Sequence, residues 1–443
     1  MGKITIYAIN LPKRKERKKH IIDQFDDKNE FKLEIVIPVP DKNPAKSLWR
    51  TIKKIVADKY SDDFVIICED DHQFTEAYSF ENFLFLIKSV IDKNADVLLG
   101  GVSSFQNGFP ISDNLFMIDE FSGTQFVIVF KQFYNKILEA DFSEFDTADY
   151  IISALTDKKF VVYPFISVQK EFGYSDATSK NNLSGRVEQL FRDTSDNMKS
   201  LKNIRLYFKE SVDRIQQSDY SNIDLAKVCI STYLVNLKSR PDRLAHVKAE
   251  FKNKPEFDIT VVEAIKHEVG AVGLWLSIRK IIETAIGNDD DVIIICEDDH
   301  EFTGYDRDQF LRNIILAQQL GAEYLSGGCS HFEHAIPVTP NLYWVSFCQA
   351  TQLIILYKPV FKKILNEPYD NSVIGDLLLS KMISNKMILY PGISVQKNFG
   401  YSDVTSVHNE NKDLITDMFS RTKVRLDRIN KMAVEHGCFL VKN

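Results

Sequence analysis

The stretch Ile66-Ile-Cys-Glu-Asp-Asp-His-Gln-Phe-Thr75 decides the fold, because it occurs twice in this chain of 443 residues. It returns with one substitution as Ile294-Ile-Cys-Glu-Asp-Asp-His-Glu-Phe-Thr303, 228 residues further on. A second block, Ser167-Val-Gln-Lys-Glu-Phe-Gly-Tyr-Ser-Asp176, returns as Ser394-Val-Gln-Lys-Asn-Phe-Gly-Tyr-Ser-Asp403, displaced by 227 residues. A nearly constant offset over so long a span predicts a tandem duplication of one unit.

Each copy is long enough to bury a core of its own, since the chain is 44% apolar and each copy has about two hundred residues. Polar, helix-compatible sequence closes the first copy, and a stretch containing Ser, Asp and Asn precedes the second. We therefore predict a first domain over residues 1–215, a linker over 216–227 and a second domain over 228–443.

Short β-rich runs alternate with helical patterns within each copy. In the first copy the predicted strands are Lys3–Leu11, Phe64–Cys68, Val97–Leu99 and Gln125–Phe130, and the predicted helices are Leu48–Lys59, Phe80–Ile91 and Phe133–Ala140. This alternation predicts an α/β fold made of two tandem Rossmann-like domains, each a mostly parallel sheet covered by helices.

Composition excludes several classes of protein. A formal net charge of −7 gives no positive field for a polyanion, so no nucleic acid is expected as a partner. The six cysteines form no C-x-x-C pair, which argues against a zinc cluster or a disulfide framework. The chain has neither a secretory signal pattern nor a membrane-spanning apolar run, so a cytoplasmic protein is expected. The basic segment Lys13–Lys19 leaves two readings open, a solvated helix face and peripheral contact with the inner membrane.

The repeated acidic motif directly follows an apolar strand in both copies. Open α/β sheets bind ligands beyond the carboxyl ends of their strands, and hard oxygen ligands there suit Mg²⁺ or Mn²⁺ on a diphosphate. The candidate metal ligands are Glu69, Asp70, Asp71, Glu297, Asp298 and Asp299. The alternative is an acidic turn that caps the next helix. His72 and His300 are either further ligands or hydrogen-bonding neighbours.

Two further patterns are candidates for binding a nucleotide cofactor or donor. The first strand of each copy ends in a polar turn whose Asn and Arg side chains suit phosphate: Asn10, Arg14, Arg17, Asn236, Arg240 and Arg243. Paired glycines after a later strand could let the backbone approach a diphosphate, although a tight turn explains them equally well: Gly100, Gly101, Gly327 and Gly328.

Several blocks together resemble glycosyltransferase family 25, which contains lipooligosaccharide and collagen galactosyltransferases. The matching blocks are Val235-Asn-Leu-Lys-Ser-Arg-Pro-Asp-Arg243, Gly270-Ala-Val-Gly-Leu-Trp-Leu-Ser277, Cys296-Glu-Asp-Asp299, Gly123-Thr-Gln125 and Ser402-Asp-Val-Thr-Ser406. The resemblance covers most of each copy. It implies a GT-A fold, a UDP-sugar donor, with galactose as the candidate sugar, and metal-dependent transfer with inversion. The implied acceptor is a glycan, a lipooligosaccharide or a glycoprotein, as in polysaccharide biosynthesis.

The two copies depart from the family pattern to different degrees. Ile278 stands where the family usually has the His of its Leu-Ser-His element. The first copy also loses both glycines of this block, with Pro44 and Ser47 opposite Gly270 and Gly273. Because proline and a side chain restrict the backbone, we expect the second copy to be the surer catalyst.

An inverting transfer needs a group that takes the proton of the acceptor hydroxyl. Asp149 and Asp376 correspond in the two copies and are the candidate catalytic bases, with a carboxylate that stabilises a helix N-terminus as the alternative reading. The candidate substrate-binding residues are Thr124, Gln125, Gln169, Asp176, Thr351, Gln352, Gln396 and Asp403. Trp49 and Trp275, at helical spacing from apolar neighbours, are expected in the core.

Two other functions fit parts of the pattern. A bivalent carbohydrate-binding or scaffold protein would gain avidity from duplication, but it has no reason to keep the donor-site residues in both halves. A nucleotidyltransferase that makes the activated sugar also places acids at strand ends, yet it usually opens with a glycine-rich loop, which neither copy has after its first strand.

Overall fold

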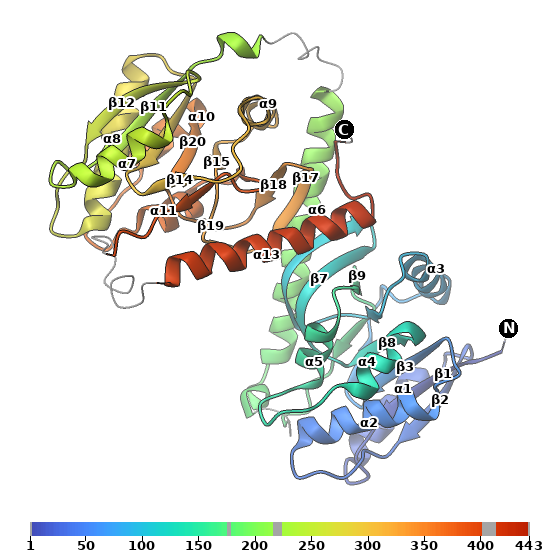
Figure 1. Cartoon of the computed structure of the whole chain (residues 1–443). Helices are drawn as coiled ribbons and strands as arrows, with labels where there is room; N and C mark the ends of the chain where they lie inside the picture. The colour runs from blue at the N-terminus through green and yellow to red at the C-terminus, as the bar shows by residue number, and fades with distance from the viewer. Residues whose placement is uncertain (1, 175–178, 216–223, 401–412, 442–443) are drawn as a thin grey trace. The chain divides into compact units, whose positions relative to one another are not determined.

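A computed structural model describes residues 2–174, 179–215, 224–400 and 413–441 of the chain. It divides into two compact units, Met1–Ile204 and Arg205–Asn443, each described by itself (Figure 1). The border between them falls inside helix α6 (Arg186–Ile215). The predicted linker over 216–227 lies largely outside the described residues, as do Asp176 and Asp403, and the predicted domain border remains a prediction.

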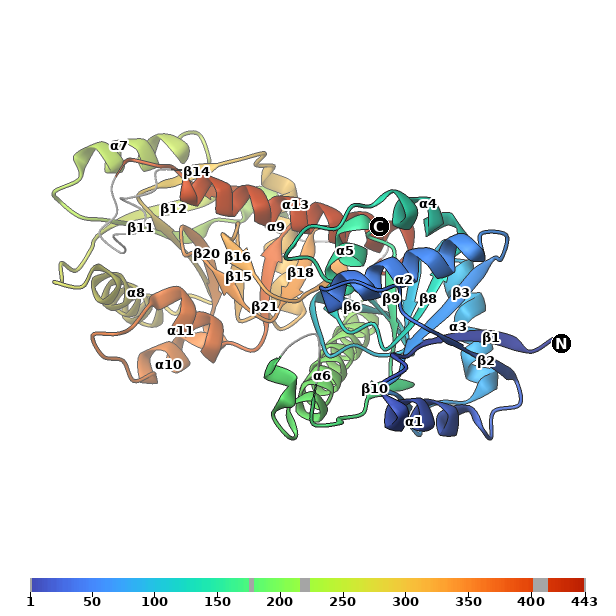
Figure 2. The same ribbon diagram turned by 90° about the horizontal axis from the view of Figure 1, so that it is seen from below.

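The first unit contains an eight-stranded sheet with the strand order β2-β1-β3-β8-β5-β9-β7-β6. Its strands are β1 (Ile4–Ile9), β2 (Phe31–Val36), β3 (Phe64–Glu69), β5 (Val97–Leu99), β6 (Ser104–Ser112), β7 (Leu115–Ser122), β8 (Phe126–Phe130) and β9 (Lys159–Val162). Its helices include α1 (Lys15–Phe25), α2 (Pro44–Asp58), α3 (Phe80–Ile91), α4 (Tyr134–Glu139) and α5 (Ala148–Leu155). Figure 2 shows α2 on one side of this sheet and α1 on the other.

The second unit repeats this topology strand for strand, in the order β12-β11-β13-β20-β15-β21-β18-β17. Its strands are β11 (Ile230–Asn236), β12 (Phe257–Glu263), β13 (Val292–Glu297), β15 (Tyr324–Ser326), β17 (Ala335–Thr339), β18 (Leu342–Val345), β20 (Leu353–Tyr357) and β21 (Lys386–Leu389). Its helices include α7 (Pro241–Glu250), α8 (Gly270–Gly287), α9 (Arg307–Gln319), α10 (Lys358–Asn366), α11 (Gly375–Met382) and α13 (Leu414–Glu435). The repeat in the sequence is therefore a repeat of the fold.

The predicted α/β fold with two sheet-containing units is confirmed, but each sheet is mixed where a mostly parallel one was expected. In the first unit β1 is parallel to β2 and β3, and β5 is parallel to β9. Strand β8 runs antiparallel to both β3 and β5, and β6, β7 and β9 form antiparallel pairs. The short β6–β7 hairpin needs no crossover helix, and alternation of strands and helices does not fix the direction of β8.

The predicted core positions are confirmed in both units. The strands that carry the acidic motif are buried on both faces, which explains their continuous apolar sequence before Glu69 and Glu297. Trp49 on α2 and Trp275 on α8 are fully buried, as predicted. Helix α2 packs with α4 and α5, and α8 packs with α10 and α11, so the helices that carry the two tryptophans have equivalent neighbours.

A small two-stranded sheet joins the two repeated blocks in each unit. In the first unit β4 (His72–Phe74) pairs with β10 (Ser167–Gln169), and in the second β14 (His300–Phe302) pairs with β22 (Ser394–Gln396). The acidic motif and the second repeated block therefore lie side by side, although they are far apart in the sequence. Within the part of the chain that the structure describes, no helix combines the length and apolarity needed to cross a membrane.

Candidate functional site

The acidic motif lies at the carboxyl-terminal edge of parallel strands in each unit. Glu297 is the last residue of β13, and Asn236 is the last residue of its parallel neighbour β11. Because parallel strands end at one edge of the sheet, these two side chains and the turn Asp298-Asp299 are brought together there. Glu69 and Asn10 hold the same positions on β3 and just after β1.

The middle aspartate of the motif is buried and paired by side chains of the first polar turn. Asn236 Nδ2 donates to Asp298 Oδ2 at 2.8 Å, and Arg243 Nη1 donates to Asp298 Oδ1 at 3.3 Å. In the first unit Asn10 and Arg17 make the same bonds to Asp70, at 2.9 and 3.1 Å. The structure therefore places these Asn and Arg residues, which were predicted to contact a nucleotide, against the acidic motif.

The other predicted arginine of each turn also faces the motif. Arg14 Nη1 lies 3.6 Å from Asp70 Oδ1, and Arg240 Nη1 lies 4.0 Å from Asp298 Oδ2. Asn236 Nδ2 also donates to the Arg240 carbonyl at 3.1 Å, which ties the turn to the end of β11. The turn and the acidic motif thus form one polar network that spans two neighbouring strands.

Burial raises the pKa of the first and third carboxylates of the motif in both units, although an arginine lies beside the third. Burial and the neighbouring Asp299 raise the pKa of Glu297 to about 8, although the Thr351 hydroxyl donates to Glu297 Oε1 at 2.6 Å. Burial and the neighbouring Asp298 raise the pKa of Asp299 to about 6, against the lowering effect of Arg243. The counterparts in the first unit behave alike, with the pKa of Glu69 at about 8 and that of Asp71 at about 6. Thr124 donates to Glu69 as Thr351 does to Glu297.

The side chains of the acidic motif decide whether it suits a divalent cation. The described residues contain no group of three or more His, Cys, Asp or Glu side chains placed to hold a metal ion. Both oxygens of Asp298 accept hydrogen bonds, whereas Asp299 Oδ1 is buried without a hydrogen-bond partner among the described residues. Mg²⁺ is commonly held by one or two carboxylates together with substrate phosphates, and Glu297 and Asp299 suit that arrangement.

Gln169 and Gln396, predicted to bind substrate, lie beside the third carboxylate of the motif. Hydrogen bonds from them lower the pKa of Asp71 and Asp299 respectively, against the raising effect of burial. They pair across the small sheets with His72 and His300, so the strand pairing fixes their place.

The histidine that follows the motif takes part in the hydrophobic packing. His72 Nδ1 and His300 Nδ1 each lie 2.7 Å from the hydroxyl of Ser167 or Ser394. Burial lowers the pKa of both histidines to about 3, so both rings are neutral at pH 7. Each ring also packs edge-on against the phenylalanine two residues later. The structure supports the interpretation of these histidines as hydrogen-bonding neighbours.

The paired glycines and the buried glutamines have a packing role. A Cβ on Gly101 or Gly328 would lie 2.1 Å from the carbonyl oxygen of Ser167 or Ser394, so only glycine fits there. The preceding glycines, Gly100 and Gly327, would bring a Cβ within 2.9 and 2.7 Å of Phe126 and Leu353. The fully buried Gln125 and Gln352 donate to the carbonyls of Gly101 and Gly328 at 2.7 and 2.8 Å. These contacts join the end of β5 or β15 to the second repeated block.

The predicted catalytic aspartates anchor the turn before the Thr-Gln pair. Asp376 Oδ2 accepts from the Ala350 N–H at 3.1 Å, and Asp149 Oδ2 accepts from the Gly123 N–H at 3.0 Å. Ala350 has a positive φ of 99°, and the corresponding residue of the first unit, Gly123, has a φ of 109°. Burial raises the pKa of Asp376, and its charge in turn helps to raise the pKa of Glu297. Asp376 is therefore electrostatically coupled to the acidic motif.

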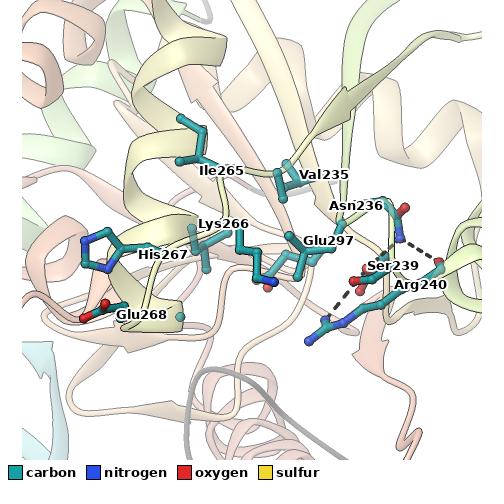
Figure 3. A pocket seen from close by; sticks show the side chains of 14 residues that line it. Val235, Asn236, Ser239, Arg240, Ile265, Lys266, His267, Glu268 and Glu297 are labelled. Atoms are coloured by element: carbon teal, nitrogen blue, oxygen red, sulfur yellow. Dashed lines mark hydrogen bonds and ion pairs between the residues drawn. The ribbon is translucent and has the colours of Figure 1, made fainter.

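A pocket of about 530 Å³ opens beside this network in the second unit. Figure 3 shows Asn236, Ser239 and Arg240 on one side and Ile265–Glu268 on the other, with Glu297 between them. Lys266, His267 and Glu268 were missed in the sequence, because no motif marks them. Their position between the end of β12 and the Gly-rich block at Gly270 is a signal that could have identified them.

The helix that borders the pocket begins differently in the two units. Helix α8 follows Val269, and among the described residues no side chain caps its first turn. In the first unit Asn43 Oδ1 accepts from the N–H groups of Ala45 and Lys46, at 2.9 and 3.3 Å, and so caps α2. Within the described residues, α8 therefore begins without the side-chain cap that its counterpart α2 has.

No protein-family model matches the sequence, and no curated protein matches it. Part of the chain is similar to a solved glycosyltransferase involved in the glycosylation of the major capsid of PBCV-1, with a TM-score of 0.27, 14% identity, and coverage of 42% of this chain and 98% of that one. It is also similar to the glycosyltransferase GlyE of Streptococcus pneumoniae TIGR4, with a TM-score of 0.27, 9% identity, and coverage of 59% of this chain and 75% of that one. A third similar structure is UDP-glucose pyrophosphorylase complexed with UDP-glucose, with a TM-score of 0.27, 7% identity, and coverage of 43% of this chain and 81% of that one. Similarities at these TM-scores establish neither a family nor an activity for this chain.

Proposed function

We propose that the chain is a glycosyltransferase whose second unit binds a nucleotide-sugar donor, with UDP as the nucleotide. The observation that carries the proposal is the pocket at the carboxyl ends of β11, β12 and β13, which joins the acidic motif to the start of α8. Its volume of about 530 Å³ is in the range of small-molecule sites. UDP and the inverting outcome rest on the resemblance to glycosyltransferase family 25.

The lining of the pocket suits a nucleoside diphosphate. Arg240 and Lys266 bring positive charge from opposite sides, and the first turn of α8 brings N–H groups together with the positive end of its dipole. In this proposal Arg243 positions Asp298, and Asn236, on the pocket wall, ties both Asp298 and the Arg240 carbonyl to the end of β11.

A divalent cation, Mn²⁺ or Mg²⁺, fits the proposal with Glu297 and Asp299 as its protein ligands and the donor diphosphate completing the shell. When bound, it neutralises charge on the departing nucleoside diphosphate. In this proposal Asp298, one of the predicted ligands, instead holds Arg243 at the start of α7.

Asp376 is the proposed general base. It lies on the first turn of α11, it is electrostatically coupled to Glu297, and burial raises its pKa toward the range in which a carboxylate accepts a proton readily. The proton would pass from the acceptor hydroxyl to Asp376 as that oxygen attacks the anomeric carbon and the bond to the diphosphate breaks. A glycan, lipooligosaccharide or glycoprotein acceptor and a cytoplasmic location, with possible peripheral membrane contact, belong to the same proposal.

A donor-hydrolysis screen tests the activity. Purified full-length chain is incubated with UDP-, GDP- and CMP-sugars, with and without Mn²⁺, and the released nucleotide is measured. The proposal expects Mn²⁺-stimulated release from one UDP-sugar, lost in Asp376→Asn. Sugar binding without release from any donor would favour the bivalent carbohydrate-binding protein instead.

A further inference from the structure

The acidic motif of the first unit already holds a positive charge between its two aspartates. Arg17 Nη1 donates to Asp70 Oδ1 and to Asp71 Oδ2, both at 3.1 Å. One guanidinium nitrogen thus bridges the second and third carboxylates of this motif. The Arg17 side chain is only 5% exposed, so water screens this pairing little.

Other contacts keep the Arg17 guanidinium in place. Arg17 Nη2 donates to the Tyr174 carbonyl at 2.7 Å. The same guanidinium lies over the rings of Phe172 and Tyr174, with its carbon 4.8 and 4.6 Å from their centroids. Since arginine stays charged at any physiological pH, this cation is permanent.

The corresponding arginine of the second unit engages the motif less fully. Arg243 Nη1 donates to Asp298 Oδ1 at 3.3 Å, but it lies 3.8 Å from Asp299 Oδ2, beyond hydrogen-bond distance. The third carboxylate of the second motif is therefore less tied to arginine than Asp71 is in the first.

The loop that follows the second strand of each unit also packs differently on the next helix. A Cβ on Gly273 would lie 2.4 Å from the Ile265 carbonyl oxygen, so the second unit's loop rests directly on α8. In the first unit Ser47 stands there and its hydroxyl donates to the Val39 carbonyl at 2.6 Å. The Ser47 side chain thus stands between the first unit's loop and α2, whereas the second unit's loop packs directly against Gly273.

We propose that Arg17 is the resident cation of the first motif, and that the chain consequently takes one divalent cation, at Glu297 and Asp299. The second half of this statement rests on the proposed function, whereas the first concerns Arg17 alone. The first unit then serves as a copy of the site whose charge is neutralised internally, and the metal-dependent step belongs to the second unit.

Counting bound Mn²⁺ by electron paramagnetic resonance, on full-length chain with UDP present, tests this inference. Wild type should bind one Mn²⁺ per chain, and Asp71→Asn should leave that number unchanged. Arg17→Gln should add one bound Mn²⁺, and Arg17→Gln with Asp71→Asn should lose it again. The matched variant Arg243→Gln should add none, because its motif already takes an ion.

Loss of a bound Mn²⁺ in Asp71→Asn would overturn the inference, as would an Arg17→Gln chain that melts cooperatively and gains no ion. The Asp71→Asn arm decides the matter if Arg17→Gln fails to fold. Wild type without Mn²⁺ but with a gain in Arg17→Gln would contradict the proposed cation site of the second unit while supporting the role of Arg17.

Discussion

Asn236 donates a hydrogen bond of 2.8 Å to Asp298, and this bond joins the ends of two parallel strands under the acidic motif. The first unit repeats it between Asn10 and Asp70 at 2.9 Å. Because both oxygens of the middle aspartate accept hydrogen bonds, we propose separate roles for two adjacent carboxylates of one motif. Asp298 holds the polar turn, and Asp299 is a proposed ligand of the cation.

Substitution separates these two roles. Asp298→Asn leaves the buried Arg243 without its closest carboxylate, and breaking a buried ion pair costs about 3–5 kcal/mol. We expect a clearly lower melting temperature for Asp298→Asn and a much smaller change for Asp299→Asn. Mn²⁺ should still raise the melting temperature of Asp298→Asn but should no longer raise that of Asp299→Asn. Thermal unfolding with and without Mn²⁺ measures both. Equal destabilisation by the two variants would show that the aspartates share one structural role.

The contribution of Glu69 and Glu297 to the stability of the metal-free chain should fall as the pH rises. The folded state raises the pKa of Glu297 from 4.5 to about 8, so it binds this proton more tightly than the unfolded state does. The stabilisation is therefore fully present below pH 4.5 and is lost as the pH rises through about 8. Urea unfolding between pH 7 and pH 8 tests this, because the lowered pKa of His72 and His300 acts mainly below that range. Glu69→Gln with Glu297→Gln should reduce the loss of stability across it. An unchanged slope in the double variant would exclude these two carboxyls as its source.

Gly273 should control donor affinity through the loop that it supports. A methyl group there would meet the Ile265 carbonyl oxygen, and displacing the loop should weaken UDP binding by about tenfold or more, which corresponds to about 1.4 kcal/mol. The matched control is Gly287→Ala on the same helix, where a Cβ meets nothing within 4 Å. Calorimetric titration with UDP compares the two variants. Equal affinities would mean that the loop does not shape the donor site.

Removing the proposed base should affect turnover and leave donor binding nearly intact. We expect Asp376→Asn to lower kcat by roughly a hundredfold or more, while Asp149→Asn in the first unit has a smaller effect. Transfer to acceptor and UDP affinity are measured on the same preparations. Full loss from Asp149→Asn with an unimpaired Asp376→Asn would reverse the assignment, and comparable partial losses would indicate two working sites.

The sequence predicted the parts of the fold that local patterns encode. Helix Phe80–Ile91 and strand Val97–Leu99 have the predicted bounds, and the buried tryptophans follow from helical spacing. Strand direction was not predictable in the same way, because alternation of apolar residues is identical for parallel and antiparallel neighbours. The reversal of β8 and the β6–β7 hairpin arise from pairings between distant segments.

The sequence identified residues of the candidate site better than it predicted the contacts between them. Asn236, Arg243 and Asp298 were all singled out, yet their hydrogen bonds to one another join residues that are 55 or more positions apart. Gln352 was predicted to bind substrate, and the structure buries it and places its amide against the Gly328 carbonyl. Lys266 and His267 went unnoticed because a pocket is formed by loops that only the folded chain brings together.

Titration of the full-length chain with UDP in the presence of Mn²⁺ tests the central claim most directly, that the donor nucleotide binds in the pocket of the second unit. The variants are Lys266→Ala, on the wall of that pocket, and Lys42→Ala, on the corresponding loop of the first unit. The account predicts one UDP per chain, bound more weakly in Lys266→Ala and with unchanged affinity in Lys42→Ala. No binding by wild type, or binding that only Lys42→Ala weakens, would contradict it.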